Sequence, residues 1–458
     1  MITGGIIVGS LRSCPGSVLI EGEKIARVFE GAVPEGIEAD ETVDVGGKLI
    51  FPGFIDAHTH FDLHVAGTVT ADDFYSGTKA AIAGGTTTII DFGTQYHGET
   101  LMQGLGNWKK KAEAGVSCDY GIHMTITEWD EGVSRECRTM MDEGVTSFKL
   151  YMTYDTQVDD ETLFKILRRL KEVGGITGVH CENDGMIAAL RQEYALDERI
   201  GLVSSHYLTR PPEAEAEAVN RLMYMAEQAD TPVIVVHMTN RLALEEIRAA
   251  RKRGQTVFAE TCPQYLLFTY KVYEKDGFEG AKYVCAPPIR SREDTDTLWK
   301  ALKDGEIQTV STDHCSFTLE QKRAGLGDFR KIPGGVLGVE TRAALIYTEG
   351  VSKGRISKED MCRVLSENPA RFYGLYPRKG VIREGSDADL VILDPSRKKV
   401  LSAADQLSRS DYSPYEGYES ACILEKVYLR GVPVAEDGKV TRENTGMFLK
   451  RNGYGGTI

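Results

Sequence analysis

The sequence predicts an α/β protein: a (β/α)8 TIM barrel with a small β-sandwich domain formed by both chain termini. Three observations support this fold class. The chain of 458 residues is longer than a single hydrophobic core usually supports. Its middle alternates eight short apolar runs with longer helical stretches, and eight strands are the number that closes a parallel barrel. Both ends instead contain short strand-like runs separated by glycines.

The eight apolar runs predict the barrel strands. They are LIFPGFIDAH (49–58), TTTIIDF (86–92), CDYGIHMTIT (118–127), SFKLYM (147–152), GITGVHCE (175–182), PVIVVHMT (232–239), TVFAETCP (256–263) and IQTVSTDH (307–314). Between them lie segments with helical spacing, such as 161–174 and 213–230, as expected for strand, helix, strand units. A doubly wound open sheet is the structural alternative. The count of eight favours the barrel.

The terminal runs predict a second, smaller domain. IIVGS (6–10), SVLIEG (17–22) and KIARVFEG (24–31) lie before the barrel, and DADLVILD (387–394) and CILEKVYLRGVPV (422–434) lie after it. Because the two ends flank the barrel, we expect them to meet in one β-sandwich. The predicted domains are residues 1–50 and 375–458 for the sandwich and its tail, and 51–374 for the barrel. The last residues, GYGGTI (453–458), are expected to form a mobile or oligomer-docking tail.

Composition limits the possible partners. The formal net charge is -14 and the isoelectric point is near 5.3, which argues against nucleic acid or an anionic membrane as the main partner and favours a small neutral substrate. The sequence has no apolar run of about 18 residues and no secretory signal pattern at its N-terminus, so we expect a cytoplasmic protein. Its nine scattered cysteines form no CxxC pair, which indicates reduced thiols.

The tripeptide His58-Thr59-His60 is the first candidate for chemistry, at the end of the first predicted strand. Side chains two residues apart on a strand point the same way, so both imidazoles can reach one metal ion. The alternative is a pair of polar strand-end histidines. The tripeptide alone does not decide between these interpretations.

Further candidates lie at matching places on other strands. Lys149 lies in the fourth strand, His180 ends the fifth, His237 ends the sixth and Asp313 ends the eighth. The carboxyl ends of barrel strands converge on one mouth, where the active sites of this fold lie. These residues therefore become neighbours, and their types favour a metal centre. By the same strand alternation, His314 and Cys181 should point away from that centre, and His123 should be a core histidine.

Lys149 needs a separate explanation, because an ammonium group would be repelled by metal ions. A buried lysine near cations has a lowered pKa, and its neutral amine can add carbon dioxide to form a carbamate. That group has one negative charge and two oxygens, which suits a bridge between two metals. The alternative is a lysine whose head pairs with a carboxylate. The surrounding histidines favour the carbamate.

With these residues in hand, the sequence resembles the amidohydrolase superfamily, and within it the hydantoinase and dihydropyrimidinase branch, over essentially its whole length. The motifs that carry the resemblance are PGFIDAHTHFD (52–62), GTVTADDFYSGTKAAIAGGTTTIIDF (67–92), SFKLYMTY (147–154), VHCEND (179–184), SSHYLTRPPEAEAEA (204–218), VVHMTN (235–240), ETCPQYL (260–266), TDHCSF (312–317) and GSDADLVILDP (385–395).

The resemblance implies a binuclear metal centre, usually of zinc. His58, His60 and Asp313 would bind the more buried metal, and His180 and His237 the other. Lys149, carboxylated to N6-carboxylysine, would bridge the two. A metal-bridging hydroxide would open cyclic amides such as hydantoins, 5-substituted hydantoins and dihydropyrimidines, giving N-carbamoyl amino acids. The family also implies a homotetramer.

The resemblance also implies how substrate is held. Asp313 would accept the proton of the nucleophile and pass it to the leaving ring nitrogen, and Tyr154 would hydrogen-bond the developing oxyanion. Ala286 and Gly334 occupy substrate-binding positions where the family usually has serine and asparagine. Val65 and Tyr151 would line the side of the pocket that receives the ring substituent.

Four alternatives within this architecture remain to be weighed. Dihydroorotase would need an arginine just after the paired histidines, where this sequence has Phe61-Asp62. Mononuclear deaminases lack the bridging lysine. An allantoinase-like activity is harder to exclude, although GTVTADDFYSGT and Tyr154 fit hydantoinases better. A non-catalytic assembly protein of the collapsin response mediator type would have lost metal ligands, whereas every ligand position is filled here.

Overall fold

A computed structural model describes residues 1–454, so four residues of the expected tail, 455–458, lie outside the described part. Its centre is an eight-stranded parallel sheet in the order β15-β14-β13-β12-β11-β10-β9-β6. The strands are β6 (Phe54–Thr59), β9 (Thr86–Thr94), β10 (Asp119–Thr125), β11 (Ser147–Tyr151), β12 (Ile176–His180), β13 (Val233–Val235), β14 (Val257–Thr261) and β15 (Thr309–Val310). A parallel bridge between Thr59 and His314 joins the first strand to the segment after the last and closes the barrel. The predicted (β/α)8 barrel is confirmed.

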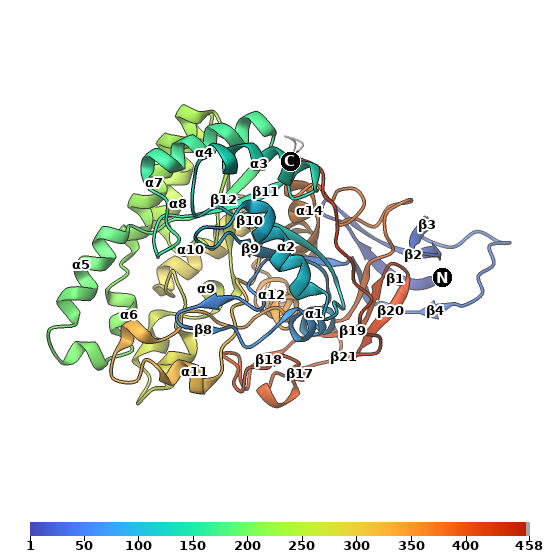
Figure 1. Cartoon of the computed structure of the whole chain (residues 1–458). Helices are drawn as coiled ribbons and strands as arrows, with labels where there is room; N and C mark the ends of the chain where they lie inside the picture. The colour runs from blue at the N-terminus through green and yellow to red at the C-terminus, as the bar shows by residue number, and fades with distance from the viewer. Residues whose placement is uncertain (455–458) are drawn as a thin grey trace.

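Helices cover the outside of the barrel (Figure 1). The long ones are α1 (Phe74–Ala83), α2 (Leu101–Ala112), α3 (Glu131–Asp142), α4 (Asp160–Val173), α7 (Pro212–Ala229), α8 (Arg241–Lys252) and α10 (Arg292–Lys303), and α5 (Asp184–Tyr194) projects from the side. Shorter ones are α6 (Ser205–Leu208), α9 (Pro263–Leu267), α11 (Leu319–Arg323), α12 (Arg342–Ile346), α13 (Lys358–Cys362) and α14 (Asn368–Phe372). Helix α4 illustrates the local code: Asp159 caps its start, Gly174 ends it at φ 80°, and its apolar stripe is buried.

The two chain ends form one nine-stranded sheet in the order β21-β20-β19-β16-β5-β1-β2-β3, with β4 beside β1. Its strands are β1 (Ile2–Val8), β2 (Ser13–Glu21), β3 (Lys24–Glu30), β4 (Val43–Asp44), β5 (Leu49–Pro52), β16 (Leu390–Asp394), β19 (Ile423–Leu429), β20 (Val432–Glu436) and β21 (Lys439–Val440). Figure 1 shows these N-terminal and C-terminal strands side by side at one end of the barrel. A bridge from Lys24 to Asp387, just before β16, folds the sheet back on itself around its own apolar core. The described chain has two further antiparallel pairs of short strands: β7 (His64–Val65) with β8 (Thr68–Val69), and β17 (Lys399–Val400) with β18 (Glu419–Ser420).

The first predicted strand differs from the structure, which divides residues 49–58 at Gly53. Strand β5 belongs to the terminal sheet and β6 to the barrel. A Cβ atom at Gly53 would lie 2.1 Å from Thr87 Oγ1, so only glycine allows the chain to pass this close to the neighbouring strand. The terminal sheet is thereby joined directly to the strand that carries His58. The domain boundaries at 50 and 374 stay predictions.

Two apolar cores hold the barrel. The larger lies between the strands and the surrounding helices. The smaller fills the barrel interior, where Ile55, Ile90 and Ile234 pack with Phe372 and Leu449. Residue Leu449 belongs to the C-terminal segment, whose backbone pairs with Tyr120.

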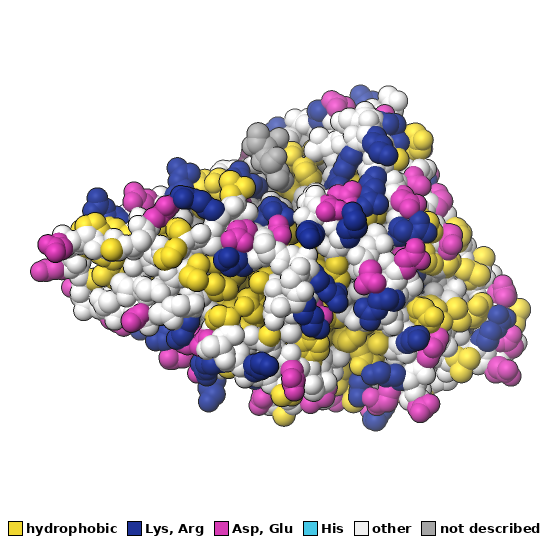
Figure 2. Space-filling view, turned by 180° about the vertical axis from the view of Figure 1, so that it is seen from behind, with side chains coloured by type: hydrophobic (Ala, Val, Ile, Leu, Met, Phe, Trp, Pro, Cys, Tyr) yellow, Lys and Arg dark blue, Asp and Glu magenta, His cyan; other side chains and the backbone are white. Residues whose placement is uncertain are grey.

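The described surface carries charges of both signs, and the cysteines are unpaired. On the face shown in Figure 2, acidic and basic side chains are interspersed. All nine cysteines lie in the described residues and none is paired with another. Within residues 1–454, no helix has the length and apolar content to cross a membrane.

Candidate metal centre

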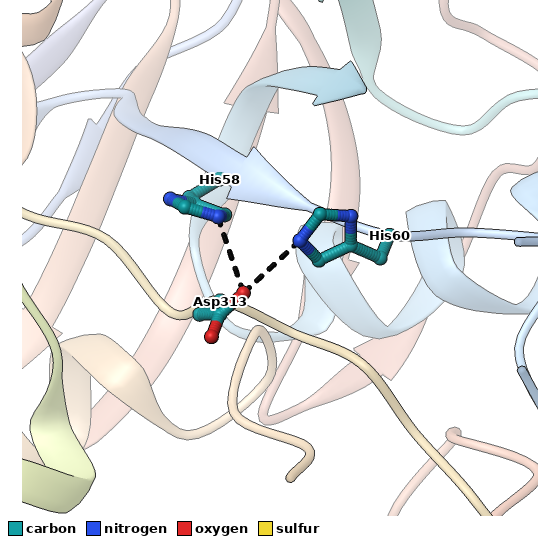
Figure 3. A group of neighbouring side chains, drawn as sticks. All are labelled: His58, His60 and Asp313. Atoms are coloured by element: carbon teal, nitrogen blue, oxygen red, sulfur yellow. Dashed lines mark hydrogen bonds and ion pairs between the residues drawn. The ribbon is translucent and has the colours of Figure 1, made fainter. Parts of the chain in front are cut away.

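The paired histidines of the first barrel strand meet Asp313. His58 Nε2 lies 3.1 Å and His60 Nε2 3.0 Å from Asp313 Oδ1. Figure 3 shows both rings pointing toward this carboxylate. One possible ligand atom from each of the three buried residues lies within 4.8 Å of the others. Two imidazoles and a carboxylate converging in this way form a donor set suited to zinc.

Two predicted ligands do not lie inside their strands. Strand β13 ends at Val235 and β15 at Val310, whereas His237 and Asp313 follow with φ of 39° and 53°. Non-glycine residues rarely adopt this left-handed conformation, which costs about 1–3 kcal/mol and is concentrated at functional sites. At both His237 and Asp313, the backbone thus leaves the extended conformation at the residue whose side chain joins the cluster. Strand alternation alone could not have predicted this turn.

The remaining predicted ligands join the same buried cluster. The His180 ring ends β12, and its centre lies 4.6 Å from that of His237, which lies 5.3 Å from that of His58. In β11, Lys149 Nζ lies 5.0 Å from the centre of the Phe92 ring, and that ring packs 4.5 Å from His58. The structure therefore brings the four histidines, Lys149 and Asp313 together.

The side chains of the cluster fit a cation. Lys149 Nζ and His237 Nδ1 are buried, and neither has a hydrogen-bond partner within residues 1–454. Leaving such groups buried and unpaired is costly, and metal ligation or carboxylation would use them. Burial lowers the pKa of Lys149 to about 8, although Asp313 and Glu260 act in the opposite direction. The neutral amine, the form that reacts with carbon dioxide, is therefore a far larger fraction near neutral pH than for an exposed lysine, although the ammonium form still predominates.

Most ionisation states suit the same role, and His58 is the exception: burial acts to lower its pKa, but the Glu260 and Asp313 carboxylates raise it. Burial lowers the pKa of His60 to about 4, and it also lowers the pKa values of His180 and His237, so these imidazoles are neutral. Burial would raise the pKa of Asp313, but His58 and His60 overcome this and hold it well below its usual value. Neutral imidazoles and an ionised carboxylate are the forms that bind metal ions.

Two carboxylates that the sequence did not single out hold the histidines in place. Glu260, near the end of β14, accepts a hydrogen bond from His58 Nδ1 at 2.6 Å, which leaves His58 Nε2 to face Asp313. Glu182 accepts one from His180 Nε2 at 2.7 Å and is paired with Arg210. Glu182 could have been found, because it lies two residues after His180. Glu260 could have been suspected, because the seventh predicted strand contributed no ligand.

We expect Glu260→Gln to weaken metal binding about 10- to 100-fold, the usual effect of losing a carboxylate that orients a ligating histidine. A glutamine can present its NH₂ group to His58 and favour the wrong tautomer. Metal content after dialysis against graded chelator would measure the change. The exposed Glu245→Gln, from an ion pair on α8, is the control. Equal metal retention in both variants would contradict this role for Glu260.

The predicted substrate positions lie around this cluster or in nearby loops. The Tyr154 ring lies 5.2 Å from that of His180 and beneath the Arg210 guanidinium, and its backbone has φ 74°. The Tyr151 ring lies 5.7 Å from that of His180. Val65 lies in the exposed β7–β8 hairpin, and Ala286 and Gly334 remain accessible in loops whose neighbouring residues are buried. The contacts of these residues with substrate stay predictions.

Comparison with known proteins supports the resemblance stated from the motifs. The model of the amidohydrolase family matches residues 49–434. The D-hydantoinase of Geobacillus stearothermophilus is 42% identical over 460 residues, covering 99% of this chain and 97% of the relative.

Solved structures give the same result. The dihydropyrimidinase of Brevibacillus agri superposes with a TM-score of 0.97 at 38% identity, covering 100% of this chain and 99% of that one. The L-hydantoinase of Arthrobacter aurescens superposes with a TM-score of 0.90 at 32% identity, covering 98% and 99%. The fold, the clustered donors at the barrel mouth and these similarities together show that the chain belongs to the amidohydrolase family.

Proposed function

We propose that this protein hydrolyses a ring amide bond of neutral cyclic amides, such as hydantoins and dihydropyrimidines, at the His58, His60 and Asp313 cluster. The observation that carries the proposal is the convergence of these three ligand atoms within 4.8 Å, in the same buried cluster as the unpaired Lys149 Nζ atom of the described chain. Relatives that are named hydantoinase or dihydropyrimidinase support the substrate class.

The residues that would hold metal fall into two sets. His58, His60 and Asp313 form one, and His180 and His237 the other, with Lys149 between them as a carbamate. For that group to form, the neutral Lys149 amine attacks carbon dioxide, a new N–C bond is made, and one proton leaves. Two divalent ions, zinc in the first instance, would supply Lewis acidity for the carbonyl and lower the pKa of water.

Two side chains of the protein, Asp313 and Tyr154, would transfer the proton and stabilise the negative charge that develops on the substrate oxygen. Water adds to the ring carbonyl carbon and the ring C–N bond breaks. Asp313, ionised because of its histidine neighbours, takes the proton from the attacking water and returns it to the leaving nitrogen. The Tyr154 hydroxyl, whose pKa is raised by burial, stays protonated and can donate to the substrate oxygen as negative charge develops on it. Hydantoin would then yield an N-carbamoyl amino acid.

The charges around the site favour a neutral ring over an acidic one. The buried cation beside Tyr154 is Arg210, and its guanidinium is already engaged by Glu182. The segment after His60 carries Phe61, which is fully buried, and Asp62, so it offers no cation to a substrate carboxylate. The homotetramer and the cytoplasmic location stay predictions.

A substrate panel with metal analysis tests the proposal. We expect ring opening of hydantoin, 5-substituted hydantoins or dihydrouracil in preference to dihydroorotate, with allantoin as a further comparison. Each enantiomer of a 5-substituted hydantoin should be assayed separately, because a D-hydantoinase and an L-hydantoinase are both similar to this chain. Chelation should abolish activity and zinc should restore it. Preference for dihydroorotate, or metal-replete protein that opens none of these rings, would overturn the proposal.

A further inference from the structure

We propose that Lys322 is a positioning residue for substrate binding: its ammonium group fastens together the two loops that carry Ala286 and Gly334. The inference rests on the proposed function, because it concerns the same site. Lys322 lies in α11, a short helix after the Asp313 segment, and it is fully buried.

The contacts of Lys322 are unusual for a buried lysine. Its Nζ donates to three backbone carbonyls: Val284 at 3.1 Å, Pro333 at 2.7 Å and Gly335 at 2.8 Å. An ammonium group has three donors, so all of them are used. No carboxylate among the described residues forms an ion pair with it. Burying a charge without a counter-ion is costly, which its pKa reflects, lowered by burial to about 7.

The three carbonyls flank the two predicted substrate positions. Val284 lies two residues before Ala286, and Pro333 and Gly335 lie on either side of Gly334. The two loops are also joined directly, because Gly335 N donates to Val284 O at 2.8 Å. Val284 O therefore accepts from both the other loop and Lys322. This one amine fixes the spacing between two backbone segments that have no regular secondary structure at these residues.

The anchoring is confined to the residues that flank the site. Val284, Pro333 and Gly335 are buried, whereas Ala286 is half-buried and Gly334 is exposed. A Cβ atom at Gly334 would meet nothing within 4 Å, so this position faces open space. Gly335, in contrast, has no room for a side chain, because a Cβ atom there would lie 2.4 Å from Cys315 O. Lys322 thus bonds the buried residues of the two loops, while Ala286 and Gly334 stay accessible.

A lysine that merely fills space would affect stability alone, whereas a lysine that sets the loop spacing would affect substrate affinity as well. Backbone groups placed in advance bind a ring without the cost of ordering the loops. Because the chemical step depends on Asp313 and the metal ligands, loosening the loops should raise KM more than it lowers kcat. The split between the two constants therefore separates these roles.

The decisive variant is Lys322→Met, which keeps the length of the side chain and removes its donors. We expect KM for the best ring substrate to rise about tenfold or more, while kcat falls less than about threefold and metal content stays at the wild-type value. Lys331→Met is the matched control, because it removes an exposed charge from the same loop without touching a carbonyl. Unchanged KM in a folded, metal-replete Lys322→Met protein would overturn the inference.

Amide hydrogen exchange gives a second measurement, and its wild-type part tests the inference even if a Lys322 variant fails to fold. In the wild-type protein, the amides of Val284 and Gly335, which donate to Ala281 O and Val284 O, should exchange slowly. They should exchange fastest in Lys322→Met and at an intermediate rate in Lys322→Gln, which keeps two donors. Exchange in the wild type as fast as in exposed loops would overturn the inference. A wild-type protein that opens no ring but protects these amides would defeat the proposed function and leave the loop fastening intact.

Discussion

Replacing Lys149 with alanine is expected to remove most of the bound metal and to reduce ring opening by more than about 100-fold. That figure is the upper effect of losing a carboxylate that only orients a ligating histidine. Lys149 Nζ is buried among the proposed ligands and has no hydrogen-bond partner in the described chain, so alanine would leave the proposed ligand sets without the carbamate oxygens. A short carboxylic acid such as acetate or propionate offers two oxygens in place of the carbamate. Added to Lys149→Ala together with zinc, it should restore part of the metal content and activity.

Metal per chain and turnover, each with and without added acid, measure this effect. Lys165→Ala is the control, since Lys165 forms only an exposed ion pair on α4. Mass spectrometry of the intact wild-type protein under non-denaturing conditions should find the added mass of carbon dioxide, and this mass should be absent from Lys149→Ala. Full activity of Lys149→Ala without any added acid would contradict the bridging role.

The second large effect is expected from Asp313→Asn. The amide keeps the size of the side chain and an oxygen that faces His58 and His60, but it cannot hold and release the proton. Turnover at saturating substrate should fall about 100- to 10 000-fold, the range typical of losing a general acid–base group. The pKa of Asp313 is held well below its usual value, so the carboxylate is already the acceptor form at neutral pH.

Metal analysis must accompany this measurement, because Asp313 is also a proposed ligand. Protein reconstituted with zinc to the wild-type level isolates the loss of the proton acceptor. The exposed Asp304→Asn, at the end of α10, serves as the control. Wild-type turnover in metal-replete Asp313→Asn would assign proton transfer to another group.

The fold could be predicted from sequence because each strand and helix of a parallel barrel has a local sequence pattern that repeats along the chain. Each buried strand appears as an apolar run, and the number of runs determines closure. The error at the first strand shows the limit of this reasoning: residues 49–58 form one continuous run, yet the chain changes sheets at Gly53. The Pro52-Gly53 dipeptide marks a break in the run, but it does not show that the two halves belong to different sheets, which depends on the close approach of Thr87.

The site was predictable to the extent that strand geometry dictates it. His58 and His60 lie two apart and face the same carboxylate, as alternation predicts, and His314 bonds Asp72 instead of joining the cluster. The turns at His237 and Asp313 lie beyond regular strands and escape this rule. The roles of Arg210 and Lys322 escape it too, because basic residues are common along the chain, and only the folded arrangement shows that Arg210 pairs with Glu182 and that Lys322 bonds two loops.

Because both chain ends contribute to one sheet, that sheet cannot form until β16 (Leu390–Asp394) and the strands after it have been synthesised. Strand β5 pairs with β1 on one side and with β16 on the other. During synthesis, Leu49 therefore has no partner on its second side until Leu393 has been added to the chain. A chain that has emerged from the ribosome as far as Asp313 carries every proposed ligand, yet β5 still has an open edge. Open edges recruit other chains, and pairings this distant in sequence form slowly. Premature termination after the barrel would therefore produce an aggregation-prone chain rather than a smaller enzyme. The exposed edge of β5, which chaperones and proteases would recognise, belongs to the terminal sheet and not to the catalytic residues in such a chain.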